Sequence, residues 1–191
     1  MRYSIVRFLL CCLAAALLTG CASVKVVETW HKPAAQTHQK IMILGIGNDE
    51  SKRKLFENIV VDELRQRMIT AVASHSILPD LDKTDRAGIV AAVHAAGCDA
   101  VLTTRVLVKG DGTVSQQQSS GDAPGYVYGA SPLTTYGSFL KATLQANLFD
   151  TKTEELVWSA TFKTFDADRE AKVSRELGKF FFEALRKDGL I

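Results

Sequence analysis

The sequence predicts an α/β (α+β) domain: a single mixed β-sheet of about five strands with helices packed on it. Residues 40–46 (KIMILGI) form a continuous apolar run, which is typical of a strand buried on both faces. Two stretches with apolar residues three to four positions apart follow, and each precedes a further strand. Residues 140–148 then alternate strictly between apolar and polar, which indicates a strand with one wet face. The predicted order is strand, helix, strand, helix, strand, hairpin, helix.

The first half of the domain contains two strand–helix units. After the strand at 40–46, the polar residues Asn48, Asp49 and Ser51 can cap a helix. Its buried stripe is expected to hold Phe56, Ile59, Val60, Leu64, Met68 and Val72. A short strand is predicted at 76–79, a second helix from Asp85 to Gly97, and a third strand at 98–108. Right-handed crossovers should make these three strands parallel.

The second half begins with an insert at 109–138 that is rich in Gly, Ser and Tyr. The strand at 140–148 then turns through 150–153 into a hairpin partner at 156–165. The last helix should start near Asp166 or Asp168 and end before Gly189. Its buried side is expected to carry Val173, Leu177, Phe180, Phe181, Ala184 and Leu185. The single domain therefore spans 40–191.

The N-terminus has the three parts of a secretory signal peptide. Arg2 and Arg7 supply positive charge, residues 8–18 are apolar, and the small-residue stretch Leu18-Thr19-Gly20-Cys21 follows. The apolar run is about half of the roughly 20 residues that a spanning helix needs. We therefore expect residues 1–20 to be removed, with cleavage between Gly20 and Cys21. An ordinary signal peptide with a coincidental cysteine is the alternative.

The stretch Leu18-Thr19-Gly20-Cys21 resembles the lipobox of bacterial lipoproteins. This resemblance implies that Cys21 becomes the acylated first residue, carrying diacylglycerol and an amide-linked chain such as palmitate. Several acyl chains make detachment from a membrane negligible. Ala22 and Ser23 follow without the Asp of inner-membrane retention, so the resemblance implies the outer membrane, with the domain facing the periplasm. Residues 21–39 are interpreted as a lipidated tether, in which 24–30 can form an edge strand.

Charge and cysteine content limit the partners of the mature chain. The whole chain has a net charge of +2, and loss of Arg2 and Arg7 leaves 21 basic and 21 acidic residues. A neutral domain without Lys/Arg clusters is not expected to bind nucleic acid. Removal of residues 1–20 takes away Cys11 and Cys12, and acylation uses Cys21, so Cys98 is the last free cysteine. We interpret it as a small buried apolar residue, with a reactive thiol as the alternative.

Catalytic motifs are weak in this sequence. Gly45 and Gly47 lie where a phosphate loop would lie, but Asp49 and Glu50 at the helix start would repel a phosphate. We therefore predict no catalytic residue, no cofactor and no metal site. A small ligand at Gly45, Gly47, Asn48 and Asp49 is the alternative. The acids and arginines of the first helix, including Arg53 and Glu57 four residues apart, are interpreted as a solvated, salt-bridged face.

The insert at 109–138 is the feature that asks for a functional explanation. Connections of this length in compact domains are usually functional or disordered. Tyr126, Tyr128 and Tyr136 lie among its glycines, and tyrosine is enriched in recognition surfaces. These three tyrosines are the candidate partner-binding residues, and plain disorder is the alternative.

Several segments resemble a widespread group of uncharacterised bacterial lipoproteins. The matching segments are residues 40–46, Arg53-x-x-Phe56-Glu57, Ser76-Ile77-Leu78-Pro79, Gly97-Cys98-Asp99-Ala100-Val101 with Arg105, and Leu156-Val157-Trp158-Ser159. More remotely, the element order resembles the TolB N-terminal-like domain, which also occurs in the curli secretion-channel lipoprotein and in the lipoprotein activator of a penicillin-binding protein. Because both act through protein contacts, the resemblance implies a non-catalytic role.

Three hypotheses about function follow. The first is a non-enzymatic envelope lipoprotein that binds an envelope protein or itself. The second is a small-ligand carrier or sensor. The third is a hydrolase, which would need a cleft joining His94 or Cys98 to carboxylates.

Overall fold

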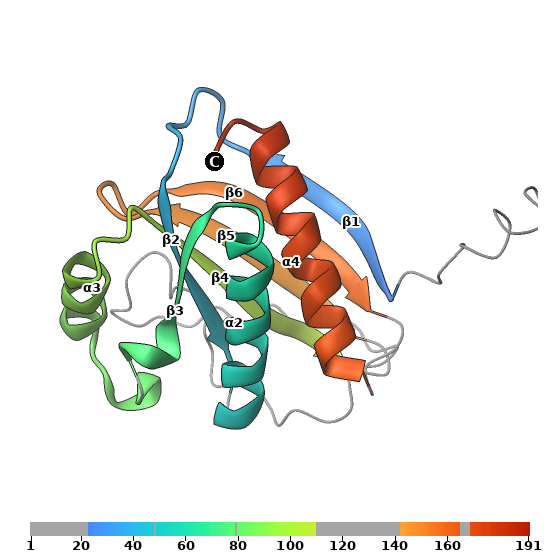
Figure 1. Cartoon of the computed structure of the whole chain (residues 1–191), viewed down its shortest axis with the longest axis horizontal. Coiled ribbons are helices and arrows are strands. Elements are labelled where there is room, and N and C mark those ends of the chain that lie inside the picture. Colours follow the sequence, from blue (N-terminus) through green and yellow to red (C-terminus); the bar gives the residue numbers. More distant parts are fainter. Residues whose placement is uncertain (1–22, 48, 79, 110–141, 165–168) are drawn as a thin grey trace, which may run out of the picture.

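The structure is a computed structural model that describes residues 23–47, 49–78, 80–109, 142–164 and 169–191. Its strands form one six-stranded sheet in the order β1-β6-β5-β4-β2-β3 (Figure 1). The strands are β1 Val24–His31, β2 Lys40–Ile46, β3 Thr70–Ala73, β4 Ala100–Lys109, β5 Ala142–Asp150 and β6 Leu156–Thr164. The helices are α2 Glu50–Arg65, α3 Arg86–Ala95 and α4 Glu170–Lys187, with 3-10 turns η1 Ser74–Ser76 and η2 Leu81–Lys83. The predicted class, a mixed sheet with helices packed on it, is confirmed.

The sheet combines a parallel and an antiparallel part, as the sequence predicts. β2 pairs in parallel with both β3 and β4, whereas the pairs β4–β5, β5–β6 and β6–β1 are antiparallel. β1 is the edge strand that the sequence allowed at 24–30, and it raises the number of strands from five to six. The following loop returns over the end of the domain, where the His38 N–H donates to the Leu190 carbonyl at 2.8 Å.

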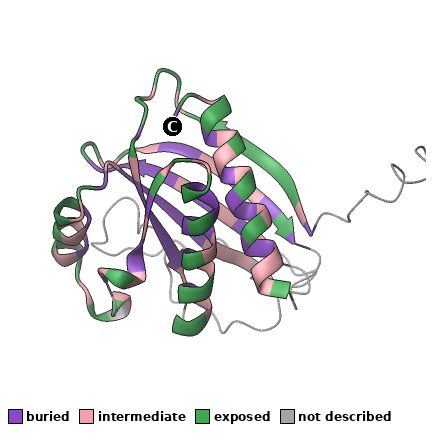
Figure 2. Cartoon of the chain, viewed as in Figure 1, coloured by how far each residue is buried: buried purple, intermediate pink, exposed green. Residues whose placement is uncertain are grey.

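Helices cover both faces of the sheet and create two cores (Figures 1 and 2). α2 and α4 lie on one face, over a large core that includes Trp158, Phe162 and Phe181. α3 lies on the other face, over a smaller core that includes Met42, Val101 and Phe149. The central strand β2 contributes alternate residues to the two cores, which explains its unbroken apolar sequence.

The first helix is shorter than predicted, and the second predicted strand is misplaced. α2 ends at Arg65, and the chain then turns through Met68, which has φ +67° and a 92% exposed side chain. Val72 lies in β3 at 70–73. The strand was expected at 76–79, but Ser76 ends the 3-10 turn η1 at 74–76 and Ile77 and Leu78 lie in the loop that follows. The three-to-four-residue spacing of apolar residues continues from α2 into β3, so the sequence pattern does not show where the helix ends. Ile77 and Leu78 pack against the α3 core from the following loop.

The predicted helix ends are largely confirmed. Asp49 caps α2 and Asp85 caps α3, each through a side-chain oxygen that accepts a backbone N–H of the first turn. Gly97 and Gly189 follow α3 and α4 with φ of +64° and +72°, a conformation in which glycine carries no steric penalty. α4 begins at Glu170, and Asp166 and Asp168 lie outside the described residues. No helix in the described part of the chain is long and apolar enough to cross a membrane.

Candidate functional site: a groove between α2 and α4

The residues that the sequence singled out are only partly described. Gly20, Cys21, Asn48, Tyr126, Tyr128 and Tyr136 lie outside the described residues. Gly45 and Gly47 lie at the carboxyl end of β2, and Asp49 caps the helix that follows, accepting from the Lys52 N–H at 3.1 Å. Of the three that are described, Gly45 lines a groove between α2 and α4.

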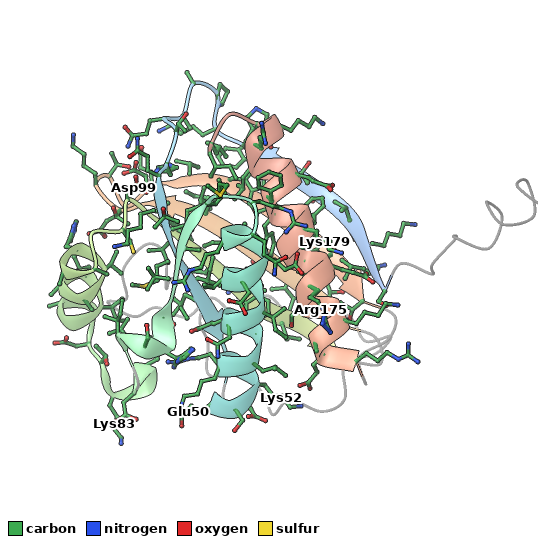
Figure 3. All side chains as sticks on the ribbon, viewed as in Figure 1. Glu50, Lys52, Lys83, Asp99, Arg175 and Lys179 are labelled. Carbon is green, nitrogen blue, oxygen red and sulfur yellow. The ribbon has the colours of Figure 1, made fainter. Side chains whose placement is uncertain are left out.

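A groove opens between α2 and α4 over the carboxyl end of β2. Deeper along the two helices no such space exists, because a Cβ added to Gly178 would lie 2.8 Å from Glu63 Cβ. Near the helix starts, Lys52 Nζ and Glu170 Oε1 form an ion pair at 2.8 Å across the gap. Figure 3 shows Lys52 at the end of α2 where the helix begins. The groove has about 540 Å³ of empty space including solvent at its mouth, and is lined by Gly45, Lys52, Arg53, Leu55, Phe56, Thr104, Arg105, Val106, Leu144, Glu170, Val173, Ser174 and Leu177.

The most informative residue of the groove is Thr104, on β4. Its side chain is 7% exposed, and its hydroxyl Oγ1 has no hydrogen-bond partner among the described residues. An unpartnered buried hydroxyl costs about 1–3 kcal/mol. Gly45 contributes close packing beside it, because an added Cβ would lie 3.2 Å from Phe56 Cδ1 and 3.3 Å from Arg53 Cγ. The groove thus combines an apolar wall with one polar group that lacks a partner.

Arg53 and Glu57 form a buried network beside the groove, so the prediction of a solvated face is wrong for this pair. Glu57 is 0% exposed, and its carboxylate accepts from Gly45 N–H at 2.9 Å, Ser74 Oγ at 2.6 Å and His75 N–H at 2.8 Å. The guanidinium of Arg53 lies 3.5 Å from Glu57 and donates to the Leu78 carbonyl at 2.6 Å. The pair therefore fixes three chain segments to the start of α2.

The groups that a hydrolase would need do not gather in the described structure. His94 is exposed on α3, whereas Cys98 is buried. Burial raises the pKa of the Cys98 thiol, Asp99 adds to the rise, and Lys40 opposes it. Within the described residues, no group of three or more His, Cys, Asp or Glu side chains could hold a metal ion.

Sequence reasoning missed two buried polar residues. Thr104 follows another threonine in a strand of ordinary composition, so nothing in the pattern marks its hydroxyl as unpartnered. His38 falls in the expected tether, but its side chain is buried and neither ring nitrogen has a hydrogen-bond partner among the described residues. Its position after a proline-containing stretch gave no sign of burial.

Comparisons with known proteins give a distant likeness. No family model matches the chain, and no curated protein matches its sequence. Among solved structures, a PelC dodecamer from Paraburkholderia phytofirmans is 14% identical; the match covers 88% of this chain and 99% of that chain, with a TM-score of 0.48. A point variant of that dodecamer is 12% identical, covers 86% and 98%, and has a TM-score of 0.46.

Proposed function

We propose that this chain is a lipid-anchored outer-membrane protein whose periplasm-facing domain binds a partner and performs no catalysis. The observation that carries the proposed anchor is the position of Ser23. It is 3% exposed, and its N–H donates to Glu176 Oε2 on α4 at 2.8 Å, so the folded domain begins two residues after Cys21. Acyl chains on Cys21 would therefore hold the domain directly at the membrane, within about 7 Å of extended chain.

The anchor is tested by replacing the sulfur atom of Cys21 with oxygen. Cys21→Ser should remove palmitate labelling, because the acyl chains attach to this residue. Cys12→Ser is the matched control, since this cysteine lies in the segment expected to be removed, and palmitate labelling should be unchanged. Palmitate labelling of Cys21→Ser, or an unlabelled parent chain, would refute the proposal.

The partner is proposed to be an envelope protein or a second copy of the chain, contacted through the insert with Tyr126, Tyr128 and Tyr136. Changing these three tyrosines to serine should remove co-purified partners or shift the oligomeric state in crosslinking of intact cells, because tyrosines supply much of the contact energy of recognition surfaces. Changing Ser115, Ser119 and Ser120 of the same insert to alanine is the control. Identical crosslinked species in both triple variants and the parent would argue against this contact.

We propose a small-ligand role for the groove as a second candidate function. The observation that favours it is the unpartnered Thr104 hydroxyl beside an apolar wall. Ligand sites in proteins are mostly apolar, with a few placed polar groups that fix orientation. The groove suits a small amphipathic molecule with an apolar body and one hydrogen-bonding group directed at Thr104.

Thr104→Val separates binding from stability. Valine fills nearly the same space without the hydroxyl, so the free energy of unfolding should rise by about 1 kcal/mol or stay unchanged. Binding of N-phenyl-1-naphthylamine, an apolar probe with one N–H, should weaken by roughly tenfold if it bonds Thr104, since 1.4 kcal/mol is a factor of ten. Thr103→Val is the control, because the Thr103 hydroxyl donates to the Asn147 carbonyl at 3.3 Å. Equal probe affinity in the two variants would exclude Thr104 from the site.

A further inference from the structure

A β-bulge in β1 places two well-separated residues on one face of the sheet. Lys25 is opposite Lys163 and Trp30 is opposite Ser159, with a register shift between Val26 and Glu28. Strand residues five apart normally point to opposite faces, whereas the extra residue in a bulge restores the same face. Lys163 and Ser159, four apart on regular β6, confirm that Lys25 and Trp30 share a face.

This face is the one turned away from α2 and α4. On β6, Trp158, Ala160 and Phe162 belong to the core beneath those helices, so Ser159, Thr161 and Lys163, which alternate with them, point the other way. α3 covers another part of this same face, where its core includes Met42, Val101 and Phe149. The remaining area, over β5, β6 and β1, is not covered by any described helix. We call it the open sheet face and define it by Lys25, Glu28, Trp30, Ser159, Thr161 and Lys163.

Two positive charges lie next to each other on the open sheet face. Lys25 and Lys163 lie directly opposite each other, and like charges in that position repel. Neither lysine makes an ion pair with a described residue. One acid, Glu28, accompanies them on this face. An external anion between the two lysines would remove the repulsion.

Trp30 adds an apolar group to the same surface. Its side chain is 47% exposed, although tryptophan is usually buried in the core of a domain. Tryptophan is enriched at the headgroup level of membranes, where its ring contacts apolar groups and its N–H remains hydrated. A cationic pair and an exposed tryptophan on one face of the sheet match the chemistry of a lipid headgroup layer.

The anchor places this face beside the membrane. Lys25 lies four residues after Cys21, so at most about 14 Å of extended chain separates them. On α4, the carboxylate of Glu176 accepts from the Ser23 N–H at 2.8 Å and pairs with Lys172 Nζ at 3.7 Å. The charge of Glu176 is therefore compensated, whereas Lys25 and Lys163 have no ion-pair partner among the described residues. The anchor therefore keeps the start of β1, and with it Lys25, close to the membrane surface.

We infer that the open sheet face rests on the headgroups of anionic phospholipid, with Lys25 and Lys163 sharing a phosphate and Trp30 at headgroup depth. The inference rests on the proposed acylation of Cys21. The depth is limited by the open edge of β1, whose backbone N–H and C=O groups can bond to water and phosphate oxygen but would be unpaired in hydrocarbon. Each lysine near an anionic surface contributes attraction that salt screens.

The test uses the acylated mature chain in vesicles of phosphatidylethanolamine and phosphatidylglycerol that contain a bromine-labelled phospholipid. Fluorescence quenching is compared between the chain and Trp30→Phe, since the second tryptophan, Trp158, is fully buried and serves as an internal reference. We expect the bromine-labelled phospholipid to quench the fluorescence of the chain, and this quenching should disappear in Trp30→Phe. A chain that floats with the vesicles but shows no quenching of Trp30 would overturn the inference alone. A chain that does not float would overturn the anchor as well.

Charge variants test the role of the lysine pair. Lys25→Glu combined with Lys163→Glu should abolish the Trp30 quenching, and neutral phosphatidylcholine vesicles should have the same effect on the parent chain. Lys54→Glu combined with Lys83→Glu is the matched control, because both lysines are exposed elsewhere, on α2 and on the η2 turn (Figure 3 labels Lys83). Equal quenching in the two double variants would overturn the lysine assignment. Protection of Trp30 from aqueous iodide in a crosslinked dimer, without lipid quenching, would assign the face to a second copy and overturn the inference.

Discussion

Glu57→Ala is expected to lower the free energy of unfolding by about 3–5 kcal/mol, the range for removing one partner of a buried ion pair. The substitution leaves Arg53 with its charge buried and also deprives the Gly45 N–H, the Ser74 hydroxyl and the His75 N–H of their acceptor. Urea-induced unfolding of the anchor-free mature chain, carrying Cys21→Ser, measures the change.

Two further variants make the Glu57 prediction specific. Glu50→Ala, at an exposed carboxylate paired with Lys54 at 2.6 Å, should change the unfolding midpoint little, because solvent screens exposed ion pairs. Arg53→Met combined with Glu57→Leu should recover only part of the loss, because it removes the unpaired buried charge but leaves the Gly45 N–H, the Ser74 hydroxyl and the His75 N–H without an acceptor. A Glu57→Ala effect no larger than that of Glu50→Ala would show that the network contributes nothing to stability.

The same pair shows why sequence alone misjudged the site. Arg53 and Glu57 are four residues apart, and that spacing is equally compatible with a solvated pair and with a buried one. Burial is decided by η1 and the loop at Leu78, which close over the start of α2. The sequence prediction also misplaced those segments, because it put a strand at 76–79, whereas the strand β3 lies at 70–73.

Elements with a strong local signal were predictable. The apolar run at 40–46 forms β2, and the strict alternation predicted at 140–148 corresponds to β5 at Ala142–Asp150. Asp49 and Asp85 begin helices and Gly97 ends one, as expected. The parallel pairing of β2, β3 and β4 followed from the handedness of crossovers.

The candidate groove was predictable at one residue. Gly45 was found from its place after the first strand, but the opposite wall comes from α4, more than 120 residues later in the chain. The lack of a partner for Thr104 depends on which side chains surround it after folding. Likewise, β1 carries exposed residues along nearly its whole length, so the sequence offered no buried stripe to distinguish it from a tether.

Trp158→Ala should also cost about 3–5 kcal/mol of unfolding free energy, as expected for truncating a buried aromatic side chain. The Trp158 ring is 0% exposed and packs on Phe181 in an edge-on arrangement with 6.3 Å between centroids. Its indole Nε1–H donates to Asp188 Oδ2 at 3.1 Å, which ties the end of α4 to β6. Truncation therefore leaves a cavity beneath α4 and removes one bond that positions this helix.

Trp30→Ala is the matched control for Trp158→Ala, because it removes the same side chain from the neighbouring strand. Trp30 is half exposed, so in the anchor-free chain its loss should change the unfolding free energy by less than about 0.5 kcal/mol. The contrast separates two tryptophans that the sequence presents alike: one holds α4 on the sheet, and the other is available for contact outside the domain. Similar losses in the two variants, measured by urea unfolding, would mean that β1 is packed as firmly as β6 and that Trp30 is a core residue.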